Sequence, residues 1–291
     1  LVIGTQPSGQ GHETSFAQVA AEWLGVPVET VTVIVGDTDV VKVGGGSHSG
    51  RSMRMAGTVI VKAADELIDK GKRLAAFVLE AAATDIEFFN ASFSIKGTDR
   101  AIGLFDLANA LSERSDVPEA LAGGLSVIED NIMEIPVFPN GCHVCEIEID
   151  PDSGAYDVVR YTTIDDVGRA INPLIVDGQT HGGIVQGAGE ALGELCAIDE
   201  HGQPLAGSFM DYHMPRADEY PSFVTALNEV PSPTNPLGVK AGGEGGTTPA
   251  LAVLVNGFVD ALRPHGVRDI RMPVTPRKIW EIIHTGKTDN A

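Results

Sequence analysis

The feature that most constrains the fold is a long stripe of apolar and small residues in the first third of the chain. The spacing between its members alternates between four and three: Ile60, Ala64, Leu67, Gly71, Leu74, Val78 and Ala81. An α-helix places residues with this spacing on one face, because its repeat is about 3.6 residues. The pattern therefore predicts one long helix with a buried stripe.

The remaining segments predict a mixture of strands and helices. Residues 150–154 are turn formers, Asp-Pro-Asp-Ser-Gly, and predict a hairpin between two strands. Residues 114–140 are rich in Pro, Gly and Asn and indicate a boundary between two lobes, residues 1–130 and 131–291. We therefore expect an α+β fold of two interlocked lobes with mixed sheets and long helices. Strands are expected at residues 1–5, 28–36, 143–149 and 156–163, and helices at 14–24, 103–113 and 175–194.

Two further helices are expected where a threonine precedes a proline. Thr248 before Pro249, and Thr275 before Pro276, each place a capping hydroxyl ahead of a proline in the first turn. The helix that follows Pro249 is almost wholly apolar, so we expect it in the interior. The helix at 175–194 instead contains many small residues, which allow a backbone or a ligand to approach closely.

The charge balance excludes some classes of partner. Forty acidic residues against 20 basic ones give a formal charge of -20, which repels phosphate backbones and anionic lipid head groups. We therefore expect no nucleic-acid binding. The sequence has no apolar stretch near ~20 residues, so it predicts neither a membrane span nor a signal peptide. It begins without methionine in a strand that lacks a nearby partner, from which we expect upstream residues to be removed or supplied by another polypeptide.

The cysteines do not indicate a disulfide framework or a metal site. Three cysteines, Cys142, Cys145 and Cys196, are an odd number in a long chain, and this fits a cytoplasmic protein. Cys142 and Cys145 are three residues apart on a predicted strand, so they point to opposite faces and cannot bind one zinc ion. We interpret them as two small core residues. No pair of histidines has the H-E-x-x-H spacing, and we expect no metal ligand from the protein.

A glycine-rich segment at residues 45–52 has the spacing of a phosphate-binding loop. Gly45, Gly50 and Ser52 occupy the required positions between a strand and a helix, but Arg51 replaces the lysine. A hydrolase that binds a nucleotide or phosphate is one interpretation, and a flexible loop is another. In either case, a row of backbone N–H groups and one guanidinium could hold an anionic or polar edge of a cofactor.

The segment at residues 240–246, Lys-Ala-Gly-Gly-Glu-Gly-Gly, places one carboxylate among small residues directly before the apolar helix. We expect this site to be tight and dry. The helix dipole would lower the pKa of Glu244 and desolvation would raise it, so a base that works near neutral pH needs desolvation to prevail. Two interpretations remain open, a catalytic base and a carboxylate that merely stabilises the start of a helix.

Five motifs, taken together in order and spacing, resemble those of one enzyme family. They lie at residues 9–14, 36–39, 166–173, 186–189 and 240–244. The family comprises xanthine dehydrogenase, aldehyde oxidase and aerobic carbon monoxide dehydrogenase, which are molybdenum hydroxylases. The resemblance extends from about residue 3 to residue 285 and covers the second, C-terminal half of that family's molybdenum subunit.

The resemblance implies a cofactor, a molybdenum pyranopterin dinucleotide, expected in its cytosine form, whose own sulfurs ligate the metal. By position, Gln10 looks like the glutamine that hydrogen-bonds the pterin, and Gln186 looks like the one beside the oxo group of the metal. Glu244 matches the active-site glutamate of the family. The other cofactor-binding residues that the resemblance implies are Gly11, Ser49, Gly50, Arg51, Ser52 and Lys240.

The resemblance also implies an activity and partners. The activity is oxidative hydroxylation of an aldehyde, an N-heterocycle or a related small molecule, or oxidation of carbon monoxide, with water as the oxygen source and Glu244 as the base. The partners are the N-terminal half of the molybdenum subunit, an iron–sulfur subunit and an FAD subunit, in a complex that dimerises; three cysteines cannot hold the two clusters themselves. We expect the chain alone to be inactive. A noncatalytic scaffold subunit with the same fold remains an alternative.

Overall fold

The computed structural model describes residues 1–286, and the chain divides into two compact units. The first unit comprises Leu1–Pro136 together with Pro233–Leu237, and the second comprises Val137–Ser232 and the chain from Gly238 onward. The lobe limits expected from the sequence, 1–130 and 131–291, stay a prediction. None of the described helices combines the length and the apolar character needed to cross a membrane.

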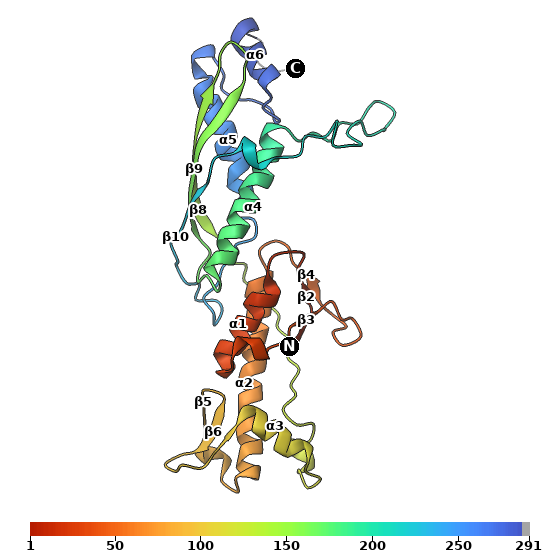
Figure 1. The fold of residues 1–291 in the computed structure, drawn as a ribbon, viewed down its shortest axis with the longest axis vertical. Coiled ribbons are helices and arrows are strands. Elements are labelled where there is room, and N and C mark those ends of the chain that lie inside the picture. The colour runs from red at the N-terminus through yellow and green to blue at the C-terminus, as the bar shows by residue number, and fades with distance from the viewer. Residues whose placement is uncertain (287–291) are drawn as a thin grey trace. The chain divides into compact units, whose positions relative to one another are not determined.

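The first unit is organised by the long helix α2 (Ser52–Val78), which has 27 residues. Its predicted stripe is buried at Ile60, Ala64 and Leu74, so the helix is confirmed. Helix α1 (His12–Leu24) packs against α2 (Figure 1). Near the C-terminal end of α2, a Cβ atom added to Gly71 would lie 2.2 Å from the ring of Phe93, so only glycine allows that ring to pack here. Phe93 belongs to the antiparallel sheet β5 (Ile86–Phe89), β6 (Ser92–Ile95) and β7 (Ala101–Gly103), which α3 (Leu104–Ser112) follows.

The strands at the start of the first unit are shorter than predicted. Four two-residue strands form two parallel pairs, β1 (Val2–Ile3) with β3 (Ile34–Val35) and β2 (Thr5–Gln6) with β4 (Gly45–Gly46). The strand expected over 28–36 is confirmed only at Ile34–Val35 and is wrong for the other residues. Its start is replaced by a 3-10 turn, Val28–Thr30, because both the N–H and the hydroxyl of Thr30 donate to the carbonyl of Pro27.

The second unit contains a mixed three-stranded sheet covered by helices. Strands β8 (Asn140–Ile149) and β9 (Tyr156–Asp166) form the predicted hairpin, and β10 (Val224–Leu227) pairs with β9 in parallel. Helix α5 (Thr247–Ala261) packs on β8, and α4 (Pro173–Leu192) packs on α5 (Figure 1). The α+β class with mixed sheets and long helices is therefore confirmed. The largest fully buried side chains of this core are Tyr161, Ile184, Leu254, Phe258, Leu262 and Ile279.

The two predicted threonine caps have different outcomes. Helix α6 (Pro276–Thr285) begins as expected, with the hydroxyl of Thr275 accepting from the N–H of Lys278 at 3.4 Å. Helix α5 begins at Thr247, earlier than expected, and Gly246 precedes it without a side-chain cap. The capping prediction for Thr248 is wrong because the chain is already helical at Thr247, where the helix contacts α4.

The interpretation of Cys142 and Cys145 as two core residues is wrong for Cys142, which is exposed. Cys145 is half-buried, and its thiol donates to the carbonyl of Val253 on α5 at 3.3 Å. Burial raises the pKa of this thiol. The two cysteines therefore differ in environment, as opposite faces of a strand require.

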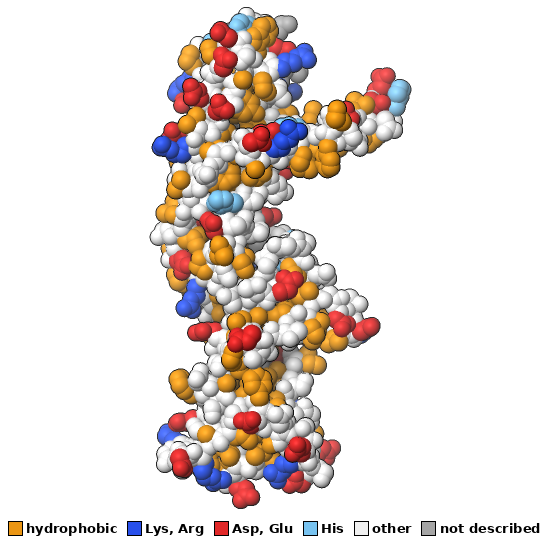
Figure 2. Space-filling model, viewed as in Figure 1, with side chains coloured by type: hydrophobic (Ala, Val, Ile, Leu, Met, Phe, Trp, Pro, Cys, Tyr) orange, Lys and Arg blue, Asp and Glu red, His pale blue; other side chains and the backbone are white. Residues whose placement is uncertain are grey.

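A projecting arm, residues 194–216, extends from the second unit after α4 (Figure 1). Figure 2 shows hydrophobic side chains gathered along it. The large apolar residues that the arm exposes are Leu195, Ile198, Leu205, Phe209, Met210 and Met214.

Candidate functional site

The glycines of α4 allow α5 to begin directly against that helix. A Cβ atom on Gly187 would lie 2.5 Å from the carbonyl oxygen of Thr247, and one on Gly183 would lie 3.0 Å from the Cα atom of Gly246. In turn, a Cβ atom on Gly246 would lie 2.5 Å from the carbonyl oxygen of Thr180. These distances are too short for real side chains, so the close backbone approach predicted for the small-residue helix is present.

Two glutamines of α4 bind the segment that carries Glu244. The side-chain amide of Gln179 donates to the carbonyl of Gly243 at 3.4 Å. The hydroxyl of Thr247 donates to the side-chain oxygen of Gln186 at 3.2 Å. Gln179 and Gln186 are seven residues apart, which is about two helical turns, so both side chains lie on one side of α4. The structure thus places Gln186 beside the start of α5, close in the chain to Glu244.

Glu244 lies in the turn before α5, where its carbonyl accepts from the N–H of Thr248 at 3.2 Å. Its side chain is exposed in this chain, whereas Ala241 and Gly246 on either side of it are buried. The expected tight, dry environment is therefore wrong for the chain by itself. The small residues that flank Glu244 bring backbones close together, but they have too little bulk to cover a long carboxylate.

Lys240, at the start of the same segment, is paired with a buried acid. Its ammonium donates to one carboxylate oxygen of Asp166, at the end of β9. The other oxygen accepts from the N–H of Gly168 at 2.8 Å and from the N–H of Val230 at 3.1 Å. Burial by itself would raise the pKa of Asp166, but the hydrogen bonds from Lys240, Gly168 and Val230 outweigh it and hold the pKa below its usual value.

In the first unit, Gln10 and Gly11 lie directly before α1. The side-chain oxygen of Gln10 accepts from the N–H of Ser8. Gly11 has a left-handed backbone, with φ of 70°, and its carbonyl accepts from the N–H groups of Thr14 and Ser15. This conformation favours glycine, so Gly11 allows the chain to turn sharply into the helix.

His12, the first residue of α1, joins this turn to the glycine-rich loop. Its ring is buried, stacks on Phe16 with the centroids 4.8 Å apart, and forms a 3.2 Å hydrogen bond with the hydroxyl of Ser47. Burial lowers the pKa of His12, against an opposing effect of Glu13. Gln10 and the loop at 45–52 therefore share one local framework.

The glycine-rich loop runs from β4 to the start of α2. Ser49 and Gly50 both have a left-handed backbone, with φ of 52° and 58°. The guanidinium of Arg51 lies against the backbone of Gly45, where an added Cβ atom would be 2.8 Å from a guanidinium nitrogen, and its Nε atom donates to the sulfur of Met55 at 3.1 Å. Ser52 is buried as the first residue of α2. The structure thus brings Ser49, Gly50, Arg51 and Ser52 together at one helix start.

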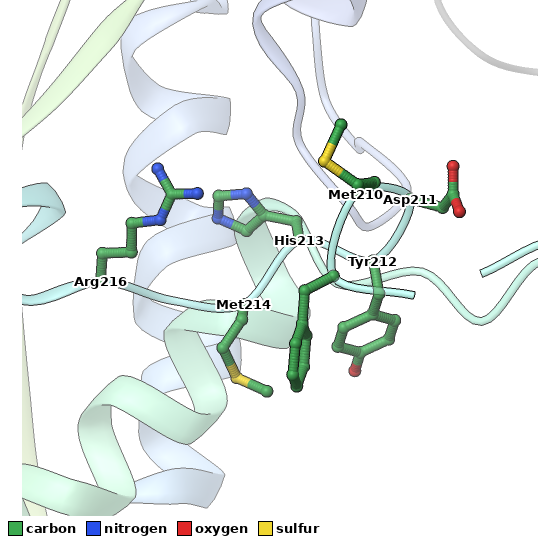
Figure 3. Close-up of a pocket in the computed structure, with 7 residues that line it drawn as sticks. Met210, Asp211, Tyr212, His213, Met214 and Arg216 are labelled. Atoms are coloured by element: carbon green, nitrogen blue, oxygen red, sulfur yellow. The ribbon is translucent and has the colours of Figure 1, made fainter. Parts of the chain in front are cut away.

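A separate pocket lies on the projecting arm and contains none of the predicted site residues. It has a volume of about 450 Å³, and Figure 3 shows the side chains of Met210, Tyr212 and His213 around it. His213 packs against Gly193, just after α4. Among residues 1–286, no group of three or more His, Cys, Asp or Glu side chains is arranged to hold a metal ion.

The sequence did not predict the roles of three residues that organise these sites, His12, Asp166 and Gln179. Asp166 lies in a motif that we singled out, and the hydrophobic context of a strand end was a signal that its carboxylate needs a partner. The identity of that partner, Lys240, was not readable, because 74 residues separate the two.

Comparison with known proteins identifies the family. The profile of the molybdopterin cofactor-binding domain family matches residues 1–221, which is most of the chain. The chain belongs to this family. Membership confirms the relationship to molybdenum hydroxylases that the five motifs indicated, and it favours that interpretation over a phosphate-binding hydrolase.

Individual relatives agree with this assignment. The chain is 40% identical over 283 residues to the gamma subunit of the 6-hydroxypseudooxynicotine dehydrogenase complex of Paenarthrobacter nicotinovorans, covering 95% of this chain and 35% of that protein. It is 33% identical to the carbon monoxide dehydrogenase large chain of Hydrogenophaga pseudoflava, with 96% and 35% covered. The structure of reconstituted CO dehydrogenase from Oligotropha carboxidovorans superimposes with a TM-score of 0.87 at 33% identity, covering 97% of this chain and 35% of that one. The chain therefore spans about a third of the length of these relatives.

Proposed function

We propose that this chain is the part of a molybdenum hydroxylase that carries the catalytic carboxylate and part of the binding site for a molybdenum pterin cofactor. The observation that carries the proposal is the arrangement around the start of α5. Gln186 accepts from the hydroxyl of Thr247, the first residue of α5, and Glu244 lies three residues earlier in the chain, which supports a shared site for these two motifs. Both side chains are exposed, so both are available to a ligand.

The residues present fit such a cofactor in three respects. Cβ atoms added at Gly9 or Gly182 would meet nothing within 4 Å, so the backbone beside Gln10 and the backbone of α4 are open to close approach. Gln186 uses its amide oxygen to accept from Thr247, which leaves its NH2 group as the donor toward a ligand. In the other unit, the exposed Ser49 precedes the half-buried guanidinium of Arg51, a pairing that suits an anionic or polar cofactor edge.

When bound, the cofactor supplies the redox centre that takes up the electrons released from the substrate. Glu244 accepts the proton that the hydroxylation of the substrate by water-derived oxygen releases. Glu244 is exposed in this chain, and a base that works near neutral pH needs a desolvated site, so we propose that other segments of the enzyme enclose Glu244. The substrate class remains that proposed from the resemblance, an aldehyde, an N-heterocycle, a related small molecule or carbon monoxide.

We further propose the cytosine dinucleotide form of the cofactor, together with partners that supply the remainder of the enzyme. Two relatives have names that refer to a subunit of a complex and to a large chain, which supports an assembly of several subunits. The proposed partners are the N-terminal half of the molybdenum subunit, an iron–sulfur subunit and an FAD subunit, in a complex that dimerises. A cytoplasmic location is proposed from the cysteines, of which Cys142 and Cys196 are free and exposed.

The test is a Glu244→Gln substitution in the complex assembled with its neighbouring subunits. We expect the variant to bind molybdenum and pterin normally but to lose turnover by a factor of roughly 10³ or more, because the general base is lost. Turnover is measured with a screen of aldehydes, N-heterocycles and carbon monoxide and an artificial electron acceptor. Glu190→Gln is a matched control, since Glu190 is an exposed carboxylate on α4 outside the motifs. Near-normal turnover of Glu244→Gln would contradict the assignment and favour a scaffold subunit.

A further inference from the structure

We propose that Asp166 is a positioning residue that, through Lys240, fixes the segment 238–246 and thereby sets the place of Glu244. The inference rests on the proposed function of Glu244 for its catalytic consequence. Its structural part, that one buried carboxylate holds this segment in place, stands on contacts within the second unit alone.

The Asp166 carboxylate is a junction of three chain segments. It accepts from Gly168 on its own segment, from Val230 after β10, and from the ammonium of Lys240. The side chains of Asp166 and Lys240 are 10% and 12% exposed, so water screens the pair weakly. A buried carboxylate that accepts three hydrogen bonds, with both oxygens engaged, is fixed in direction, and it fixes its donors in turn.

Two backbone hydrogen bonds also join the chain after β9 to the segment 238–246. The N–H of Lys240 donates to the carbonyl of Val167 at 2.7 Å, and the N–H of Arg169 donates to the carbonyl of Gly238 at 2.9 Å. The two backbones approach closely, since a Cβ atom on Gly168 would lie 2.3 Å from the Gly238 carbonyl oxygen. Gly168 also has φ of 67°, which favours glycine at this position. The register of the segment is therefore set immediately before Ala241.

Glu244 is held from both directions as a result. On one side is the junction at Lys240, and on the other is the start of α5, which is packed on α4. Between them, Gln179 holds the carbonyl of Gly243, and the methyl group of Ala241 is buried. The glycines in this segment have no side chains to restrict it, so these anchors are what limits its conformations.

This assignment gives Lys240 a role different from the one that the family resemblance implied. Its ammonium is engaged by Asp166 within the chain, so we assign Lys240 to holding the Glu244 segment. Asp166 and Lys240 are 74 residues apart in the chain, and their contact joins the motif at 166–173 to the motif at 240–244.

The neighbouring Asp165 offers a matched control. It is also buried, but its carboxylate contacts different partners, the ring of His143 at 3.2 Å and the hydroxyl of Thr163 at 2.8 Å. Those partners lie within the hairpin of β8 and β9 and not on the segment 238–246. Replacing Asp165 with Asn therefore removes a comparable buried carboxylate and leaves the junction at Lys240 intact.

The experiment measures hydrogen–deuterium exchange of peptides covering residues 239–248 in the assembled complex, together with cofactor content, kcat and KM. Asp166→Asn and Lys240→Met should each make the 239–248 amides exchange about ten-fold faster or more, whereas Asp165→Asn should not change them selectively. Lys240→Arg keeps the charge and should return exchange toward that of the unaltered protein. With cofactor still bound, kcat of Asp166→Asn should fall on the order of 100-fold while KM changes little, since a displaced base affects the reaction and not substrate binding.

Two results would overturn the proposal. One is unchanged exchange at 239–248 in both Asp166→Asn and Lys240→Met, and the other is an equal acceleration at 239–248 in Asp165→Asn, which indicates general destabilisation of the second unit. If Asp166→Asn fails to fold, Lys240→Met and Lys240→Arg supply the comparison. Faster exchange at 239–248 combined with full activity of Glu244→Gln would refute the proposed function and leave the positioning role intact.

Discussion

The two segments predicted to bind the cofactor are held in place by different kinds of interaction. In the first unit, contacts with uncharged partners hold the glycine-rich loop: Ser47 bonds to a buried imidazole, and Arg51 contacts a sulfur atom and a glycine backbone. In the second unit, a buried ion pair between Asp166 and Lys240 holds the segment before Glu244. A neutral framework tolerates the loss of one contact, while a buried charge that loses its partner strongly destabilises the fold. Substitutions in the two units should therefore differ in how much they lower the free energy of unfolding.

The largest expected effect is that of Lys240→Met. The substitution leaves the Asp166 carboxylate buried without its countercharge, so we expect the free energy of unfolding of the second unit to fall by about 3 kcal/mol. Urea unfolding followed by the fluorescence of Trp280, with Trp23 replaced by Phe, measures it. Arg277→Met is the matched control, because the Arg277–Glu281 pair is exposed and should contribute less than about 0.5 kcal/mol. Equal effects of the two substitutions would show that the buried Asp166–Lys240 pair contributes no more to stability than an exposed ion pair.

A smaller effect is expected at the contact of α4 with α5. Gly187→Ala places a methyl group 2.5 Å from the Thr247 carbonyl and 2.9 Å from the Ala250 methyl group, so the helices must separate, at a cost of about 2 kcal/mol. Gly182→Ala, five residues earlier on α4, meets nothing within 4 Å and should stabilise α4 by about 0.5 kcal/mol. Thermal unfolding of both variants checks the contrast. Similar changes in Tm would show that the close approach is not required.

In the first unit, Ser47→Ala should be milder. It removes the hydroxyl partner of His12 and should destabilise the unit by about 1 kcal/mol, as expected for one neutral hydrogen bond. Ser49→Ala, in the same loop, alters only an exposed contact with His48 and should change stability by less than about 0.5 kcal/mol. Urea unfolding followed by Trp23 fluorescence, with Trp280 replaced by Phe, measures both. A loss from Ser47→Ala as large as that from Lys240→Met would be inconsistent with a neutral framework.

The smallest effect is a pH dependence confined to the first unit. Burial lowers the pKa of His12 in the folded state below its unfolded value of 6.5, so the unfolded state binds more protons below that pH. The contribution of His12 to stability is therefore fully present above about pH 6.5 and is lost as the pH falls from there toward the lowered folded pKa. His12→Gln should flatten the dependence between pH 7.5 and 5.5 in the Trp23 unfolding assay. A persistent slope in that variant would assign the effect to another group.

Local pattern was enough to predict several elements. The stripe from Ile60 onward specified α2, the turn formers at 150–154 specified the hairpin, and Thr275 before Pro276 specified the start of α6. Each of these rests on residues within a few positions of one another, where helical or strand periodicity and capping are decided. The strand expected over 28–36 was also decided by a local contact, because Thr30 bonds to the carbonyl of Pro27 and favours a 3-10 turn there.

The sequence alone identified the family and predicted the helical scaffold and the residues of the candidate site, because motif order, periodicity and capping are written along the chain. Only the tertiary structure decided that Asp166 pairs with Lys240, that Ser47 meets His12, and that Glu244 is left exposed beside two closely packed helices. These outcomes depend on which distant segments come together and how much of a side chain they cover. A pattern with a period of two or 3.6 residues specifies a buried face, but it does not specify the partner that covers it.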